Sequence, residues 1–251
     1  MGLINLFDEL NQKMIKFHHL KQYAEAVTYA EQALDIAREI WGESHLRVAT
    51  SIQNLAGLYK SQGRWIESEC LYKDALQMMR RLLGDSHVDV AISLNNLAEL
   101  YENQGRWIES ECLYKDALQM MRRLLGNEHL DVATCLSNFA LLYETQGHWS
   151  ECEALYIEAL QMRIRLLGDE HPLVAKSLDN LGDVYYSQGC FSKAEQFYLE
   201  ASQMRERLGD AHRVRSKPVG RRPPRPNRVW SKTVGTGKFS LGASCLRRGH
   251  L

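Results

Sequence analysis

Apolar residues recur along most of the chain with the period of an α-helix. Val48, Ile52 and Leu55, for example, are spaced so that they fall on one face of a helix with 3.6 residues per turn. A second run with the same period follows over residues 65–83. No segment alternates with the period of two that a half-buried strand requires. The pattern therefore predicts pairs of α-helices and no β-sheet.

The two-helix pattern repeats every 42 residues. Residues 42–83 and 84–125 are identical at 33 of 42 positions. Glycine and histidine mark the period, at Gly42, Gly84, Gly126, Gly168 and at His45, His87, His129, His171. The first 41 residues fit the same register, and the last copy lacks one residue. We therefore predict five units, at about 1–41, 42–83, 84–125, 126–167 and 168–208.

One such hairpin buries too little surface to be stable alone, so the copies must cover each other's apolar faces. The expected fold class is all-α: a right-handed superhelical solenoid of stacked helix-turn-helix repeats. We interpret nearly all the periodic apolar and aromatic residues as core, including Trp65, Trp107 and Trp149. Glycine after a helix, as at Gly63, and proline at a helix start, as at Pro172, fit the predicted ends.

Charge divides the chain near residue 210. Residues 1–209 carry 20 Lys+Arg and 30 Asp+Glu, a net charge of 20 − 30 = −10, whereas residues 210–251 carry 11 Lys+Arg and one acid, a net charge of 11 − 1 = +10. Four of the five prolines also lie after residue 210. We therefore expect a repeat domain over 1–209 and a basic Pro/Gly/Arg-rich tail over 210–251.

The tail has three possible interpretations. Its composition is typical of a disordered linker, which is the one we favour. It is also consistent with a sixth repeat replaced by unrelated coding sequence, because the repeat pattern restarts at residues 209–212 and then stops. In the third interpretation it is a basic arm that binds nucleic acid or an anionic surface. In all three, residues 168–208 lack a following repeat and should be the least protected unit.

The motifs within each unit resemble a known repeat. Asn54-Leu55-Ala56, Tyr59, Gly63, Trp65, Tyr72 and Ala75-Leu76 are similar to the tetratricopeptide repeat. The 42-residue length, with Ser-Leu-Asn-Asn-Leu-Ala at 93–98 and Gly-Asp-Glu-His-Pro-Leu-Val-Ala at 168–175, resembles the kinesin light chain-like subtype. The resemblance covers about residues 5–209. It implies a non-enzymatic protein-interaction scaffold that binds a peptide or protein partner in its concave groove.

A motor cargo adaptor of the kinesin light chain type is the alternative function. Kinesin light chains bind the motor heavy chain through a heptad segment that precedes their repeats. Here the repeats begin almost at once, and residues 1–20 are too short for three or four heptads. The resemblance therefore favours only the partner-binding part of that role. A second alternative is binding of nucleic acid or an anionic surface by the basic tail.

Positions opposite the apolar face of each first helix would line the groove. One asparagine stands there per unit, and its amide can both donate to and accept from a peptide backbone. These residues are Asn54, Asn96, Asn138 and Asn180. Neighbouring positions vary between units, as partner choice requires, and are acidic overall. The predicted groove residues among them are Gln53, Asn95, Glu99, Asp179 and Asp183. A neutral to basic extended segment is the expected ligand.

Other chemistry is not expected. The four phased histidines lie one repeat apart, too far for two nitrogens on one zinc ion, and are interpreted as helix-start residues. No phosphate loop, nucleophile elbow or cofactor motif occurs, so we predict no enzyme, no cofactor, no metal and no small-molecule substrate. No apolar run suits a membrane span and no secretory signal is seen, so no membrane association is expected. Six cysteines without CxxC pairing favour the cytoplasm. No feature assigns an oligomeric state.

Overall fold

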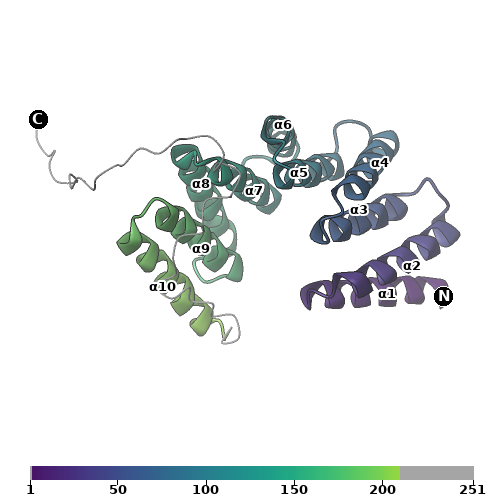
Figure 1. The fold of residues 1–251 in the computed structure, drawn as a ribbon, viewed down its shortest axis with the longest axis horizontal. Coiled ribbons are helices and arrows are strands. Elements are labelled where there is room, and N and C mark those ends of the chain that lie inside the picture. Colours follow the sequence, from purple (N-terminus) through teal and green to yellow (C-terminus); the bar gives the residue numbers. More distant parts are fainter. Residues whose placement is uncertain (1, 210–251) are drawn as a thin grey trace, which may run out of the picture. The chain divides into compact units, whose positions relative to one another are not determined.

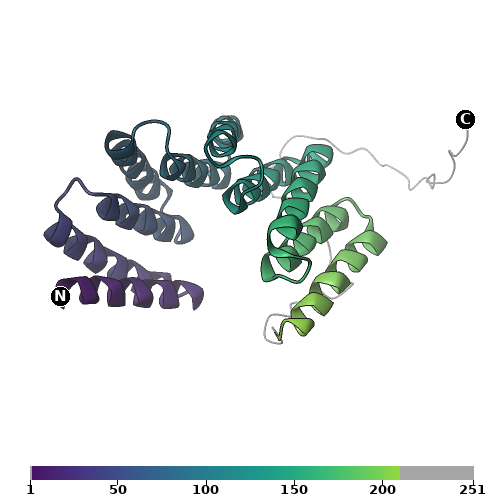
Figure 2. The ribbon, with the colours of Figure 1, turned by 180° about the vertical axis from the view of Figure 1, so that it is seen from behind.

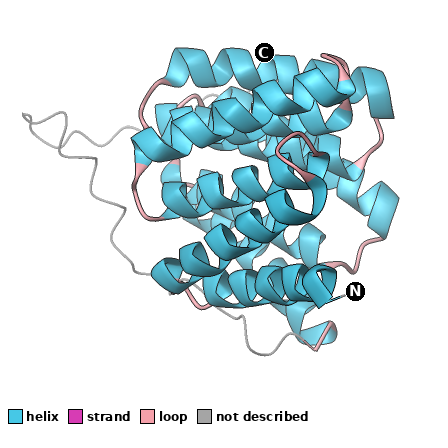
Figure 3. Ribbon diagram, turned by 90° about the vertical axis from the view of Figure 1, so that its right-hand side faces the viewer, coloured by secondary structure: helices cyan, strands magenta, loops and turns pink. Residues whose placement is uncertain are grey.

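The computed structural model describes residues 2–209, and within them the chain forms only α-helices and loops (Figures 1 and 3). Residues 2–209 form ten helices, which follow one another in pairs. They are α1 (Gly2–His19), α2 (Tyr23–Trp41), α3 (Leu46–Ser61), α4 (Trp65–Leu83), α5 (Val88–Asn103), α6 (Trp107–Leu125), α7 (Leu130–Gln146), α8 (Trp149–Leu167), α9 (Pro172–Ser187) and α10 (Phe191–Arg207). The all-α solenoid predicted from the 42-residue period is confirmed.

The two helices of each repeat pack against each other, and the second packs against the first helix of the next repeat (Figures 1 and 2). The apolar face of α3 is the predicted one, since Val48, Ile52 and Leu55 are each no more than 5% exposed. One cluster of buried apolar side chains runs from α3 to α8 without a break. A second cluster joins α1 and α2 to α3 and α4. The apolar core is therefore shared between neighbouring repeats.

Histidine begins the first helix of each of the last four repeats. The ring Nδ1 of His87 accepts a hydrogen bond of 3.1 Å from the backbone N–H of Asp89, and so caps α5. The same 3.1 Å bond starts the other three helices, at His45, His129 and His171. Because the first four N–H groups of a helix have no partner within it, this bond satisfies one of them. The phased histidines are thus helix-start residues.

Buried serines tie the two helices of a repeat together. The Ser68 hydroxyl donates to the Ala56 carbonyl at 2.8 Å, and Ser110 donates to Ala98 at the same distance. Both serine side chains are fully buried. They lie one repeat apart, so the same bond fixes the same pairing of helices twice.

The interpretation of the tryptophans as core was wrong for two of the three. Trp65 is 38% and Trp107 43% exposed, while Trp149 is partly buried. Each is the first residue of its helix. A side chain in the first turn lies at the end of the helix pair, where fewer neighbours cover it. The first buried side chains of these helices follow one turn later, at Ser68, Ser110 and Cys152.

The tail assigned to residues 210–251 lies outside the described residues, together with the interpretations attached to it. Of the helices in 2–209, none has the length and apolar character needed to cross a membrane.

Candidate partner-binding site

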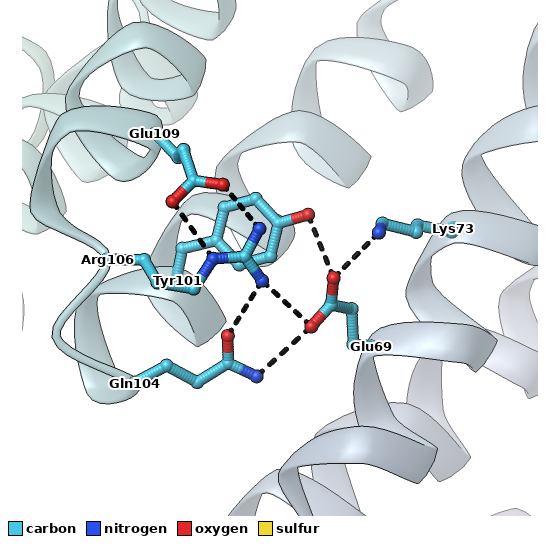
Figure 4. A network of polar contacts seen from close by, with 6 residues as sticks. All are labelled: Glu69, Lys73, Tyr101, Gln104, Arg106 and Glu109. Carbon is cyan, nitrogen blue, oxygen red and sulfur yellow. Dashed lines mark hydrogen bonds and ion pairs between the residues drawn. The ribbon is translucent and has the colours of Figure 1, made fainter.

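Tyrosine–glutamate hydrogen bonds hold successive repeats in register. In the joint between the second and third repeats, the Tyr101 hydroxyl on α5 donates to Glu69 Oε1 on α4 at 3.2 Å. Arg106 lies over the Tyr101 ring, with Cζ 3.7 Å from its centroid, and pairs with both Glu69 and Glu109 (Figure 4). The corresponding hydroxyls at the other joints are those of Tyr59, Tyr143 and Tyr185, which donate to Glu31, Glu111 and Glu153.

Glu69 is the centre of this network. Burial of its carboxylate opposes ionisation, but hydrogen bonds from Lys73, Arg106 and Gln104 outweigh it and lower the pKa of Glu69 to about 2 (Figure 4). The carboxylate is therefore charged throughout the physiological range. These hydrogen bonds link the first helix of each repeat to the second helix of the repeat before it.

A cleft opens on this surface beside α1, α3 and α5. Its volume is about 680 Å³. Apolar side chains, among them Met14, Leu58 and Ile92, form part of its wall. The polar lining includes Asn54, Asn96, Gln53, Glu99, Lys60, His18 and His19. Four of the nine predicted groove residues thus lie together around one hollow.

The floor of the cleft is unusual among the repeats. In each of the last three repeats a tyrosine on the second helix donates to a carboxylate on the first. These pairs are Tyr114–Glu102 and Tyr156–Glu144, both at 3.1 Å, and Tyr198–Asp183 at 2.6 Å. In the second repeat the matching acceptor positions are Gly57 and Lys60. Within residues 2–209, Tyr72 therefore has no such carboxylate, and its hydroxyl lies 3.2 Å from where a Cβ on Gly57 would be.

The four phased asparagines differ in how accessible they are. Asn54 is exposed, and Asn96, Asn138 and Asn180 are partly buried. Asn138 donates through Nδ2 to Asn95 Oδ1 at 3.3 Å, across the gap between α7 and α5. Asn95 itself is only 7% exposed. The amides of Asn54 and Asn96 are the two that face the cleft.

The predicted acidic groove residues are paired inside the protein. Lys60 Nζ lies 2.6 Å from Glu99 Oε1. Arg205 forms an ion pair with Asp179, and Asp183 accepts from Tyr198. Gln53 hydrogen-bonds to Ser93 on the next first helix. The groove is therefore closer to neutral than its count of carboxylates indicates.

Glu102 is a further acidic group on α5, one repeat along from Lys60. Burial raises the pKa of Glu102 to about 7, and the charges of Glu99 and Glu144 add to this, while the hydrogen bond from Tyr114 and the charge of Lys60 oppose it. Sequence reasoning missed this residue as a titrating group, because its burial depends on helices from two repeats.

A protein-family comparison decides what these repeats are. The family model of the tetratricopeptide repeat matches residues 10–81, 52–122, 89–151 and 149–207, which together cover most of the chain. The chain is a tetratricopeptide repeat protein. This confirms the resemblance drawn from the motifs around Asn54 and Tyr72. Among curated protein sequences no match is found.

Solved structures show the same fold as this tetratricopeptide repeat protein. BtubC (BKLC) from P. vanneervenii is 21% identical with a TM-score of 0.61, covering 94% of this chain and all of that one. A putative kinesin light chain from Podosopora anserina with nearly identical TPR-like repeats is 20% identical with a TM-score of 0.62, covering 81% and 96%. A Rap protein complexed with Competence and Sporulation Factor is 14% identical with a TM-score of 0.70, covering 82% of this chain and 56% of that one. The repeats are therefore similar to those of kinesin light chains.

Tetratricopeptide repeat arrays are protein-interaction scaffolds, and this chain has that architecture. Sequence reasoning placed the asparagines on the groove surface but did not find the gap at Gly57. The signal was present in the alignment of the repeats, where glycine replaces Glu99, Leu141 and Asp183. What could not be seen was that Tyr72, fifteen residues later in the sequence, lies beneath that gap.

Proposed function

We propose that this tetratricopeptide repeat protein binds an extended segment of a protein partner along the groove of its first helices, without catalysing a reaction. The observation that carries the proposal is the cleft of about 680 Å³ lined by Asn54 and Asn96. Its mixed apolar and polar wall is typical of a ligand site. In this proposal Asn138, Asn180, Asp179 and Asp183 continue the groove beyond the cleft that Gln53 helps to line. Asn95 accepts a hydrogen bond from Asn138.

The spacing of the repeats suits an extended ligand. Packed helices lie about 8–10 Å apart, and an extended peptide rises about 3.3 Å per residue. One asparagine can therefore serve roughly every third ligand residue. The apolar wall of the cleft, including Met14 and Ile92, would take a ligand side chain, and the Tyr72 hydroxyl can donate to it. The pairing of Lys60 with Glu99 leaves the cleft close to neutral, and the repeat domain around it carries a net charge of −10, so a neutral to basic segment fits better than a strongly acidic one.

The unpaired cysteines support a location in a reducing compartment. The five cysteines within the described residues are all unpaired: Cys70, Cys112, Cys135, Cys152 and Cys190. Disulfides are rare in the cytosol, where thiols stay reduced. We therefore place the protein in the cytoplasm as part of the proposal.

Replacing both cleft asparagines tests the proposal. Affinity capture on the wild-type chain, with quantification by mass spectrometry, would identify partners whose recovery drops with N54A/N96A. Each lost hydrogen bond costs about 0.5–1.5 kcal/mol, so the affinity of a groove partner should fall about 5- to 150-fold. The measurement is titration calorimetry with the captured partner.

The matched control is N127A, because Asn127 is exposed in the turn before α7 and lies outside the cleft lining. It should leave the affinity unchanged. A partner that binds N54A/N96A as tightly as the wild type, while circular dichroism shows the variant folded, would contradict binding in this cleft.

A further inference from the structure

An arginine without a counter-charge is buried between the fourth and fifth repeats. Arg163 on α8 is 5% exposed. Its Nη1 donates to Ser177 Oγ on α9 at 2.5 Å, and its Nη2 donates to the Ala133 carbonyl on α7 at 3.3 Å. Its Nε is buried without a partner. Among the ion pairs formed within residues 2–209, none involves Arg163.

The other repeats show what this position ordinarily holds. Met79 and Met121, two and one repeats earlier, are 3% and 2% exposed and belong to the apolar core. In the fifth repeat the equivalent residue is Arg205, and it forms an ion pair with Asp179. The residue of the fourth repeat that corresponds to Asp179 is Ser137. Arg163 thus has the charge of Arg205 without the carboxylate that compensates it.

The apolar core is interrupted at the same place. The cluster that begins in α3 ends at Met162, the residue before Arg163. Beyond it, α9 is held by two smaller clusters, one around Leu181 and one around Leu178. A guanidinium keeps its charge even when buried, so its desolvation is not relieved by loss of a proton.

The polar joint is also built differently here. At the second and third repeats Arg64 and Arg106 lie over the joint tyrosines, with Cζ 3.8 and 3.7 Å from the ring centroids. At the fifth repeat the equivalent residue is Cys190, and the cation over Tyr185 is Lys193, at 4.9 Å. The joint between α8 and α9 therefore keeps its tyrosine–glutamate hydrogen bond, from Tyr185 to Glu153 at 2.5 Å, and differs from the earlier joints in carrying the uncompensated charge of Arg163.

We propose that the joint between α8 and α9 is a built-in opening point, at which α9 and α10 move away from α1–α8 as one pair so that the guanidinium of Arg163 reaches water. Opening takes place about the loop of residues 168–171, and the pair stays internally packed through Val174, Leu178 and Met204. If the proposed function holds, the part of the groove on α3, α5 and α7 is always present. Asn180 belongs to the groove only while the joint between α8 and α9 is closed. The opening itself does not depend on that function.

Hydrogen exchange of the full chain, read by mass spectrometry, tests the proposal. In the wild type, amides of α9 and α10 should exchange faster than those of residues 84–125. R163M installs the residue found at the two earlier positions. Replacing a buried charge by a hydrophobic residue of similar volume is stabilising in comparable cases, so protection of α9 and α10 should rise about tenfold or more. Protection of α5 and α6 should stay the same.

Two further variants separate an uncompensated charge from simple loosening of the last described pair. S137D supplies a carboxylate at the position equivalent to Asp179 and should also raise protection of α9 and α10. R205M removes an arginine that is already paired, and should not raise it. The proposal is overturned if R163M and S137D both leave exchange of α9 and α10 unchanged, or if those amides are as protected in the wild type as residues 84–125. Loss of a groove partner with unchanged exchange behaviour would bear on the proposed function alone.

Discussion

Glu102 shows how its surroundings change the chemistry of one side chain. Its carboxyl accepts from Tyr114 on α6 and lies near Glu99 on its own helix, Lys60 on α3 and Glu144 on α7. Burial raises its pKa to about 7, from 4.5. Between these two values the folded protein holds a proton that the unfolded chain has already released. The free energy of unfolding therefore falls as the pH rises from about 4.5 to 7.

Glu102→Gln should remove that dependence on pH. The amide keeps the shape and can still accept from Tyr114, but it never ionises. The wild type should lose up to about 3 kcal/mol of stability through this group between pH 4.5 and 8, and the variant should lose correspondingly less. Urea unfolding at pH 5 and pH 8 measures the difference. Glu206→Gln removes an exposed carboxylate on α10 and serves as the control. Equal slopes for the wild type and Glu102→Gln would show that Glu102 titrates normally.

At the scale of helices, Arg106 connects the polar groups of the joint between the second and third repeats. It connects the turn before α6 with Glu69 on α4 and covers the Tyr101 ring on α5 (Figure 4). Arg106→Ala should lower the free energy of unfolding by about 1 kcal/mol, the amount typical of a partly exposed cation–π contact and ion pair. Thermal unfolding followed by circular dichroism measures it. Arg106→His, the residue found at position 148, should lose less because an imidazole can still lie against the ring, as His148 does near Tyr143. An effect as large for Arg106→His as for Arg106→Ala would argue against the ring contact.

The helices and their pairing could be predicted from sequence, because the apolar period and the 42-residue repeat act within short distances along the chain. The histidine caps could be predicted too, since each accepts from a residue two positions away. The joints could not, because Tyr101 and Glu69 belong to different helices 32 residues apart. The burial of Arg163 was not predicted either. Its burial follows from its alignment with Met79 and Met121, and a polar residue at a core position reads as surface unless the repeats are compared at that position.

At the scale of the whole array, stability should follow from repeats and the joints between them, in near-additive fashion. The helices α4 and α6 have the same sequence, so the surface that α4 offers to α5 recurs on α6. An array that contains one joint of this kind can therefore accept a second. The repeat over residues 84–125 suits such an insertion best. Its first helix already packs on the sequence that α6 shares with α4, and its second helix already packs on α7.

Inserting a second copy of residues 84–125 after Leu125 should give a folded and more stable protein. The new joint would place a copy of α5 on α6, which reproduces the existing contact of α5 on α4, and the following joint to α7 would be the native one. Additional nearest-neighbour contacts raise the stability of such arrays, so the urea midpoint should increase. The matched control duplicates residues 126–167 after Leu167. There Arg163 would face Cys135 in place of Ser177, so the guanidinium would lose a hydrogen-bond partner, and the midpoint should rise less or fall. A larger increase for the control than for the 84–125 copy would show that sequence identity of the joints does not govern the stability of this array.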